Sequence, residues 1–356
     1  MKSTTVLVIG IIIVALVVAV VALLSQPAST PTPTPSQTSQ QQTQQPPPTR
    51  YSVIIATGGT GGVYYYYGGV IAGILKNYTN IDATSIQTAA SIDNLLLIRD
   101  KTDPKRGIYY CATTLPESAY LAYTGQHEKF KDKPAPIAIL WAMYPNYLHI
   151  VTRSDSGIKS IYDLKGKRVS TGAPGSGTEI EALLVLQILG IDPAKDFSKW
   201  ERLGAAESAD ALKSGTIDAY FWSGGLPTSS IVELGVSLKQ QGVSLVLIEI
   251  PDEVINAFTQ KFPGVATKGV IPKSVYGTEK DTQTLTFWNM FVCHKDMPDD
   301  LAYLITKTVF QHLDILQASV KAAKDTNLQN ALLYYGGSIP YHPGALRYYK
   351  EVGVLK

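Results

Sequence analysis

Residues 56–69 read ATGGTGGVYYYYGG, a glycine-rich bend followed by four tyrosines. The preceding YSVIIAT (51–57) is rich in β-branched residues and predicts a buried strand, and VYYYYGGVIAGILKN (63–77) predicts a helix. The first amides of a helix have no intrahelical partner and carry partial positive charge, so they attract anions. Glycines before them let the backbone approach an anion closely. The stretch therefore predicts an anion-binding unit of strand, loop and helix.

A second unit of the same kind stands at TGAPGSGTE (171–179), again between a strand and a helix. Open α/β sheets bind ligands at the carboxyl ends of their strands, so two such loops favour one shared site. The alternative is that each loop only permits tight packing, which the pairing makes the weaker interpretation. Candidate ligand contacts are Thr57, Gly59, Thr60, Gly61, Val63 and Tyr64 in the first unit, and Ser176, Gly177 and Thr178 in the second.

The remaining candidates follow other predicted strands. Ser91 and Asn94 look like the capped start of a helix over 91–100, and Thr114 ends a predicted strand. Trp222, Ser223 and Gly225 follow the predicted strand DAYFW (218–222). Aromatic walls with a few hydroxyls suit a small polar ligand. Of the four tyrosines, at most two can face a cleft, and Tyr64 is the best candidate.

From residue 51 onward, short β-branched runs alternate with helical periods, which predicts mostly parallel sheets flanked by helices. The pattern runs twice, so we expect an α/β fold of two lobes with a cleft between them. Residues 51–145 with 263–356 would form lobe 1, and 146–262 would form lobe 2. Within APIAILWAMYPNYLHIVTR (135–153) we expect two strands around a turn at Tyr144-Pro145.

The amino-terminal fifty residues have a different composition. Residues 6–24 are uninterrupted by charge and long enough to cross a bilayer, so 1–25 would be a membrane anchor, or a cleaved signal segment as the alternative. Residues 26–50, rich in Pro, Thr and Gln, predict a disordered tether. The folded body would then lie outside the cytoplasm, on the membrane.

Several function classes find no support in the sequence. A net charge of +2 gives no basic field for nucleic acid. Phosphate-loop, dinucleotide and nucleophile-elbow motifs all fail at one required position, and the five histidines lack metal-ligand spacing. We therefore expect no enzyme activity, no cofactor and no metal. Cys111 and Cys293 lie in apolar stretches, and we favour two buried thiols over a disulfide.

Long ordered blocks resemble one known family. TGGTGGVYYYYGG, YPNYLHIVTRSDSGIKSIYDLKGKRVSTGAPGSGTE, IDAYFWSGGLPT, MPDDLAYLITKTVF and SIPYHPGALRYYKEVG are similar to the TAXI family of TRAP-transporter solute receptors. The resemblance covers residues 51 to the end. It implies a type II periplasmic-binding-protein fold, and we expect a monomer. It also implies a small carboxylate ligand, such as glutamate or a 2-oxoglutarate-like compound, and delivery to a TRAP-type membrane permease.

The resemblance also implies that the two glycine loops contact the ligand. One segment departs from the family pattern: Thr114 and Glu117 stand where the family usually has an aspartate-bearing segment. A Glu117 carboxylate near an anion site would oppose a dicarboxylate. Two alternatives stay open: a sensory module that binds without transport, and a cell-surface α/β enzyme.

Overall fold

The computed structural model describes residues 51–356. The predicted anchor (1–25) and tether (26–50) lie outside the described residues. Among residues 51–356, no helix combines the length and the apolar character needed to cross a bilayer.

The strands form one ten-stranded mixed sheet in the order β2-β1-β3-β10-β4-β7-β5-β6, with β8 paired to β4 and β9 to β10. The bounds are β1 Ser52–Ala56, β2 Asp82–Ile86, β3 Ile108–Thr114, β4 Ile137–Arg153, β5 Arg168–Ser170, β6 Lys199–Glu201, β7 Ala219–Gly224, β8 Leu245–Leu247, β9 Ala266–Ile271 and β10 Thr282–His294. Pairing is parallel within β2-β1-β3 and within β7-β5-β6, and antiparallel wherever β4 or β10 takes part. The expected parallel sheets are thus joined by an antiparallel centre.

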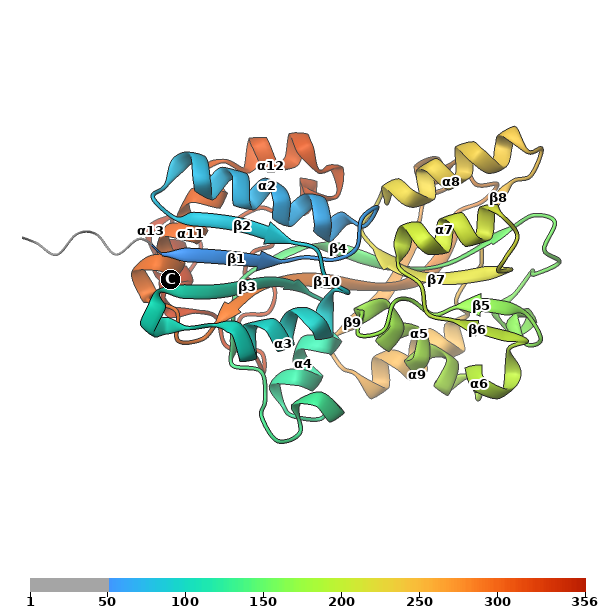
Figure 1. Ribbon diagram of the computed structural model, residues 1–356, viewed down its shortest axis with the longest axis horizontal. Helices are drawn as coiled ribbons and strands as arrows, with labels where there is room; N and C mark the ends of the chain where they lie inside the picture. Colours follow the sequence, from blue (N-terminus) through green and yellow to red (C-terminus); the bar gives the residue numbers. More distant parts are fainter. Residues whose placement is uncertain (1–50) are drawn as a thin grey trace, which may run out of the picture. The chain divides into compact units, whose positions relative to one another are not determined.

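Helices cover the parallel parts of the sheet on both faces (Figure 1). Their bounds are α2 Val63–Tyr78, α3 Ser91–Lys101, α4 Pro116–Tyr123, α5 Gly177–Ile188, α6 Pro193–Asp196, α7 Ala205–Lys213, α8 Ser229–Gln240, α9 Asp252–Lys261, α10 Lys273–Tyr276, α11 Asp299–Gln311, α12 Leu313–Ser319 and α13 Pro343–Glu351. Short 3₁₀ turns lie at Pro104–Arg106, Glu128–Phe130, Ile161–Leu164 and Lys321–Asp325. Helix thus follows strand through most of the chain, as the periodicity predicts.

The apolar core divides in two along the sheet. One cluster joins buried residues between Val53 and Tyr144 with those between Met290 and Tyr349, and we call this unit the terminal lobe. Two further clusters hold residues between Leu148 and Phe287, and we call that unit the middle lobe. Leu115, which follows β3 of the terminal lobe, packs into it from the other side. Because β4 and β10 run through both lobes (Figure 1), no single residue separates them. The predicted boundaries at 145/146 and 262/263 stay a prediction.

The centre of the sheet corrects one expectation. Residues 137–153 form the single strand β4, and Tyr144-Pro145 makes no turn. Proline lacks an amide donor and is tolerated in a sheet where the ladder is irregular. Pro145 lies opposite Trp288 at such a place, where the register shifts between Trp288 and Met290. The proline therefore marks an irregularity inside a long strand.

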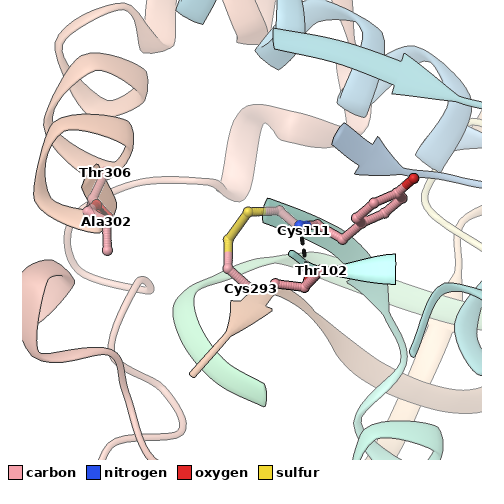
Figure 2. The surroundings of a disulfide bond; sticks show 6 residues. Thr102, Cys111, Cys293, Ala302 and Thr306 are labelled. Atoms are coloured by element: carbon pink, nitrogen blue, oxygen red, sulfur yellow. Dashed lines mark hydrogen bonds between the residues drawn. A yellow bond between two sulfur atoms is a disulfide. The ribbon is translucent and has the colours of Figure 1, made fainter. Parts of the chain in front are cut away.

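The cysteines correct a second expectation, because Cys111 and Cys293 form a disulfide. They are register partners on the antiparallel strands β3 and β10, with Cα atoms 4.0 Å apart. Figure 2 shows the bond bridging the two strands, with Ala302 and Thr306 of α11 in its surroundings. The cysteines are 182 positions apart in the sequence, so their neighbourhood depends on the sheet order, which periodicity alone does not give.

Candidate functional site

A cavity of about 60 Å³ lies between the two lobes, where β1, β5 and β7 end. It is lined by Gly58, Gly59, Gly62, Val63, Tyr64, Thr88, Ala89, Ala90, Ser91, Leu115, Tyr144, Asn146, Ala173, Ser176, Gly177, Thr178, Gly204, Ala205, Trp222, Ser223 and Gly224. Both glycine loops therefore contribute to one cavity, the terminal lobe giving the first and the middle lobe giving the second.

The cavity wall contains the first residues of four helices. One of them, α3, begins at Ser91 and has its Ile92 and Asp93 amides bonded to the Gly175 carbonyl. Val63 begins α2, Gly177 begins α5 and Ala205 begins α7. The cap residues of α2 and α7 are Gly62 and Gly204, neither of which provides a side-chain cap. None of the lining residues, all within the described part of the chain, carries a charged side chain. The partial charges of helix ends therefore dominate the electrostatics of the wall, and they favour an anion.

The second loop is held by its own side chains. The Ser176 hydroxyl accepts a hydrogen bond from the Glu179 amide at 3.0 Å. The Glu179 carboxylate accepts one from the Gly175 amide at 3.0 Å and pairs with Arg202. This arrangement is close to a capping box, and it fixes the entry into α5.

The first loop is held from below by the sheet. Thr57 is fully buried, and its hydroxyl donates to the Ile86 carbonyl at 2.7 Å. The Asn94 amide group donates to the carbonyls of Thr57 (2.7 Å) and Thr113 (2.8 Å), which ties together the ends of β1 and β3. Ala90 is the N-cap residue of α3, so the predicted cap at Ser91 is wrong by one position. The Ser91 hydroxyl instead accepts from the Leu115 amide at 3.1 Å.

A chain of side-chain hydrogen bonds crosses the floor of the cavity from one lobe to the other. The Tyr64 hydroxyl on α2 donates to the Asn289 side-chain oxygen on β10. The Asn289 amide donates to the Asn146 side-chain oxygen at 3.2 Å, and the Asn146 amide donates to the Ser223 hydroxyl at 2.6 Å. The Ser223 backbone amide in turn donates to the Thr178 hydroxyl at 3.1 Å. The polar groups of the floor are thus oriented by one another.

Two carboxyl groups are buried close to the cavity without lining it. Glu117 on α4 belongs to the terminal lobe and Glu181 on α5 to the middle lobe, and both are fully buried. One oxygen of Glu117 and both of Glu181 have no hydrogen-bond partner. Burial raises the pKa of Glu117 to about 7. Burial, and then the nearby Glu117 charge, raises the pKa of Glu181 well above its usual range. Burial therefore favours the neutral form of both carboxyl groups, and Glu117 has a pKa of about 7.

Tyr64 stays protonated beside these acids. Its pKa is raised well above 10, first by burial and then by Tyr144, Glu117 and Glu181. Its hydroxyl is therefore a hydrogen-bond donor at any physiological pH. Within residues 51–356, no group of three or more His, Cys, Asp or Glu side chains is placed to hold a metal ion.

A family model described as the NMT1-like family matches residues 55–353. The chain belongs to the NMT1-like family. Because the match extends over nearly the whole described body, both glycine loops of this NMT1-like chain and every residue of its cavity lie within it.

Solved structures add similarities at low sequence identity. The NMT1-like chain is similar to MatC from Rhodopseudomonas palustris with bound malate, at 14% identity and a TM-score of 0.49, covering 86% of this chain and 97% of that one. It is similar to the periplasmic aliphatic sulphonate binding protein SsuA from Escherichia coli, at 13% identity and a TM-score of 0.43, covering 85% and 83%. It is also similar to a TctC solute binding protein from Polaromonas, at 15% identity and a TM-score of 0.42, covering 86% and 99%.

The structure brings nine of the predicted contact residues of this NMT1-like protein to the cavity wall. They are Gly59, Val63, Tyr64, Ser91, Ser176, Gly177, Thr178, Trp222 and Ser223. The other six do not line it: Thr57, Thr60, Gly61, Asn94, Thr114 and Gly225. Thr57, Asn94 and Thr114 are buried below the wall, whereas Thr60 and Gly61 face α7 and α8 at the outer rim. A side chain at Gly225 would come within 2.7 Å of Tyr144, so that glycine serves packing.

Sequence reasoning missed Tyr144, Asn146 and the start of α7 at Gly204 and Ala205, and it missed Asn289 behind the wall. One signal for the asparagines was present: each is a single amide in a strongly apolar strand, WAMYPNYLHI and TFWNMFVC. Asparagine is uncommon in strands and costly to bury without partners, so its presence there indicates a polar contact.

Proposed function

We propose that this protein is an extracytoplasmic solute-binding receptor that holds a small carboxylate, such as glutamate or a 2-oxoglutarate-like compound, in the cavity between its lobes. One observation carries the proposal: the wall presents the amino termini of α2, α5 and α7 and no charged side chain. First-turn amides recognise a carboxylate without a cationic side chain. The nine lining residues predicted from the sequence would be among the contacts.

The buried acids are compatible with an anionic ligand in their neutral form. Burial raises the pKa of both Glu117 and Glu181, and so favours the neutral form of each carboxyl. A neutral carboxyl does not repel an anion. Binding of a carboxylate would favour the protonated form further, so affinity should fall as the pH rises above 7.

We further propose that the receptor belongs to the TAXI subfamily and works as a monomer. It would be anchored through residues 1–25 and deliver its ligand to a TRAP-type permease without chemical conversion. The ordered sequence blocks and membership of the NMT1-like family support this assignment. Uptake of the identified ligand should stop when the gene is deleted. Uptake that continues unchanged would favour a sensory role.

The binding step can be tested by calorimetry on the folded body. Glutamate and 2-oxoglutarate are compared with their dimethyl esters, which keep the shape and lose the charge. Ala205→Pro removes the first amide of α7, where proline is well accepted, and the preceding Gly204 has a compatible extended backbone (φ −70°, ψ −176°). We expect affinity about tenfold weaker, in line with the loss of one charge-assisted hydrogen bond.

Ala205→Ser is the matched control, because it changes the side chain and keeps the amide. The proposal fails if neither acid binds, if the esters bind as well as the acids, or if the proline and serine variants have equal affinity.

A further inference from the structure

The two glycine loops contact the opposite lobe as well as the cavity. Gly61, in the loop of the terminal lobe, accepts hydrogen bonds through its carbonyl from the Ser229 hydroxyl (3.0 Å) and the Ser230 amide (3.4 Å). Both donors lie in the first turn of α8, in the middle lobe. The N-cap residue of α8, Thr228, makes no side-chain cap, so the Gly61 carbonyl takes that role.

The second loop makes the reciprocal contact. Gly175, in the middle lobe, accepts hydrogen bonds through its carbonyl from the amides of Ile92 (3.1 Å) and Asp93 (3.4 Å). These amides lie in the first turn of α3, in the terminal lobe, and its N-cap residue Ala90 makes no side-chain cap. Each loop therefore caps a helix of the other lobe, on two different sides of the cavity.

Gly62 and Gly177 lie one and two residues after these carbonyl groups, and the closeness of the lobes leaves little room for a side chain at either position. A Cβ atom on Gly62 would lie 3.0 Å from the ring of Trp222 in the middle lobe. A Cβ atom on Gly177 would lie 2.3 Å from Leu115 and 2.7 Å from the Ser91 hydroxyl. Gly59, in the same loop as Gly62, has open space where its Cβ would be. Bare backbone is thus needed where the lobes meet.

We propose that the two loops form a reciprocal latch: the Gly61 and Gly175 carbonyls cap α8 and α3 when the lobes close, and both contacts break when the lobes open. Gly61, Gly175, Ser229 and the first amides of α3 and α8 are positioning groups that act on the ligand through closure. The latch depends on contacts between protein groups only, so it holds whichever ligand the cavity takes.

The latch can be tested without any ligand, by measuring the distance between two spin labels. The labels are placed at Lys105→Cys in the terminal lobe and Lys239→Cys in the middle lobe, both exposed. The native cysteines are bonded to each other and do not react. Gly177→Ala inserts a methyl group between the lobes, and Gly59→Ala is the matched control in open space. Ser229→Ala removes one donor to Gly61 without touching the cavity wall.

We expect the unliganded wild-type protein and Gly59→Ala to share a population at the closed distance. In Gly177→Ala the ratio of closed to open molecules should fall at least about tenfold, as expected for overpacking. In Ser229→Ala it should fall about two- to tenfold, as expected for one hydrogen bond. Thermal unfolding shows whether each variant is folded. If Gly177→Ala does not fold, the distance distribution of Ser229→Ala alone tests the latch.

Three results would overturn the latch: a wild-type protein with no closed population, identical distance distributions in wild type and Ser229→Ala, or an equal loss of the closed population in Gly59→Ala. A failure to bind carboxylates would leave these distances unchanged, so the latch and the proposed ligand can fail separately.

Discussion

In the terminal lobe the glycine loop leads into α2 without a side-chain cap, whereas in the middle lobe Ser176 and Glu179 hold the loop before α5. The terminal lobe instead stabilises its loop from the sheet, through Thr57 and Asn94. The same strand, loop and helix are thus fixed locally in one lobe and by long-range contacts in the other. We therefore expect long-range changes to damage the terminal lobe more than the middle lobe.

The largest expected effect follows from the disulfide, which cross-links only the terminal lobe. Cys111 and Cys293 join β3 to β10 across 182 positions. Closing a loop of that length restricts the unfolded chain, so removing the bond should lower the free energy of unfolding by about 5 kcal/mol. Urea unfolding with and without a reductant measures the change. Hydrogen exchange should show the greater loss of protection in β3 and β10, compared with β5 and β7.

The control is the double variant Cys111→Ala, Cys293→Ala, whose stability should not respond to the reductant. Equal loss of protection in both lobes would break the comparison between them.

A second prediction concerns the two buried acids, one from each lobe. A carboxyl group whose pKa is raised on folding binds its proton more tightly in the folded state. The folded state is therefore favoured at low pH, and stability is lost as the pH rises from the unfolded value near 4.5 through the folded value, about 7 for Glu117. Glu117→Gln removes the ionisation and should raise the free energy of unfolding at pH 8 by up to about 3 kcal/mol relative to wild type.

The gain should largely disappear at pH 4, where the Glu117 carboxyl group is mostly protonated in both the folded and the unfolded state. Urea unfolding at the two pH values measures it. Glu179→Gln is the matched control on α5, because Glu179 pairs with Arg202, and glutamine there should lower stability at pH 8. Destabilisation of Glu117→Gln at pH 8 would show that its carboxyl group has an ionic partner.

Local pattern predicted most elements that position the site, including β1, α2, α5 and β7 and the meeting of the two loops. The residues it misplaced depend on partners far along the chain. Thr60 belongs to a loop whose composition is typical of an anion-binding site. Its side chain nevertheless faces outward, toward α7 and α8 at the rim. Asn289 reaches the site only because β10 lies beside β4 at the centre of the sheet. No period of 2 or 3.6 residues encodes strand order, so sequence reasoning could not place it.

The smallest prediction tests the long-range support of the first loop, at two adjacent glycines of α2. A Cβ atom on Gly68 would lie 2.3 Å from the Thr57 methyl group, whereas one on Gly69 would have no neighbour closer than 3.8 Å. Gly68→Ala should therefore lower the free energy of unfolding by about 2 kcal/mol through overpacking. Gly69→Ala should raise it by about 0.5–1 kcal/mol, because alanine favours the helix.

The two variants change the same helix by the same methyl group, so helix propensity cancels in their difference. Urea unfolding of the pair measures how firmly α2 is seated on Thr57. If Gly68→Ala and Gly69→Ala both stabilise the protein, Thr57 moves to accommodate the added methyl group. Contacts with the sheet would then not fix the first loop. If Gly68→Ala lowers the free energy of unfolding, Gly69→Ala raises it, and only Gly68→Ala weakens ligand binding, then the packing of α2 against Thr57 also sets the position of the cavity wall.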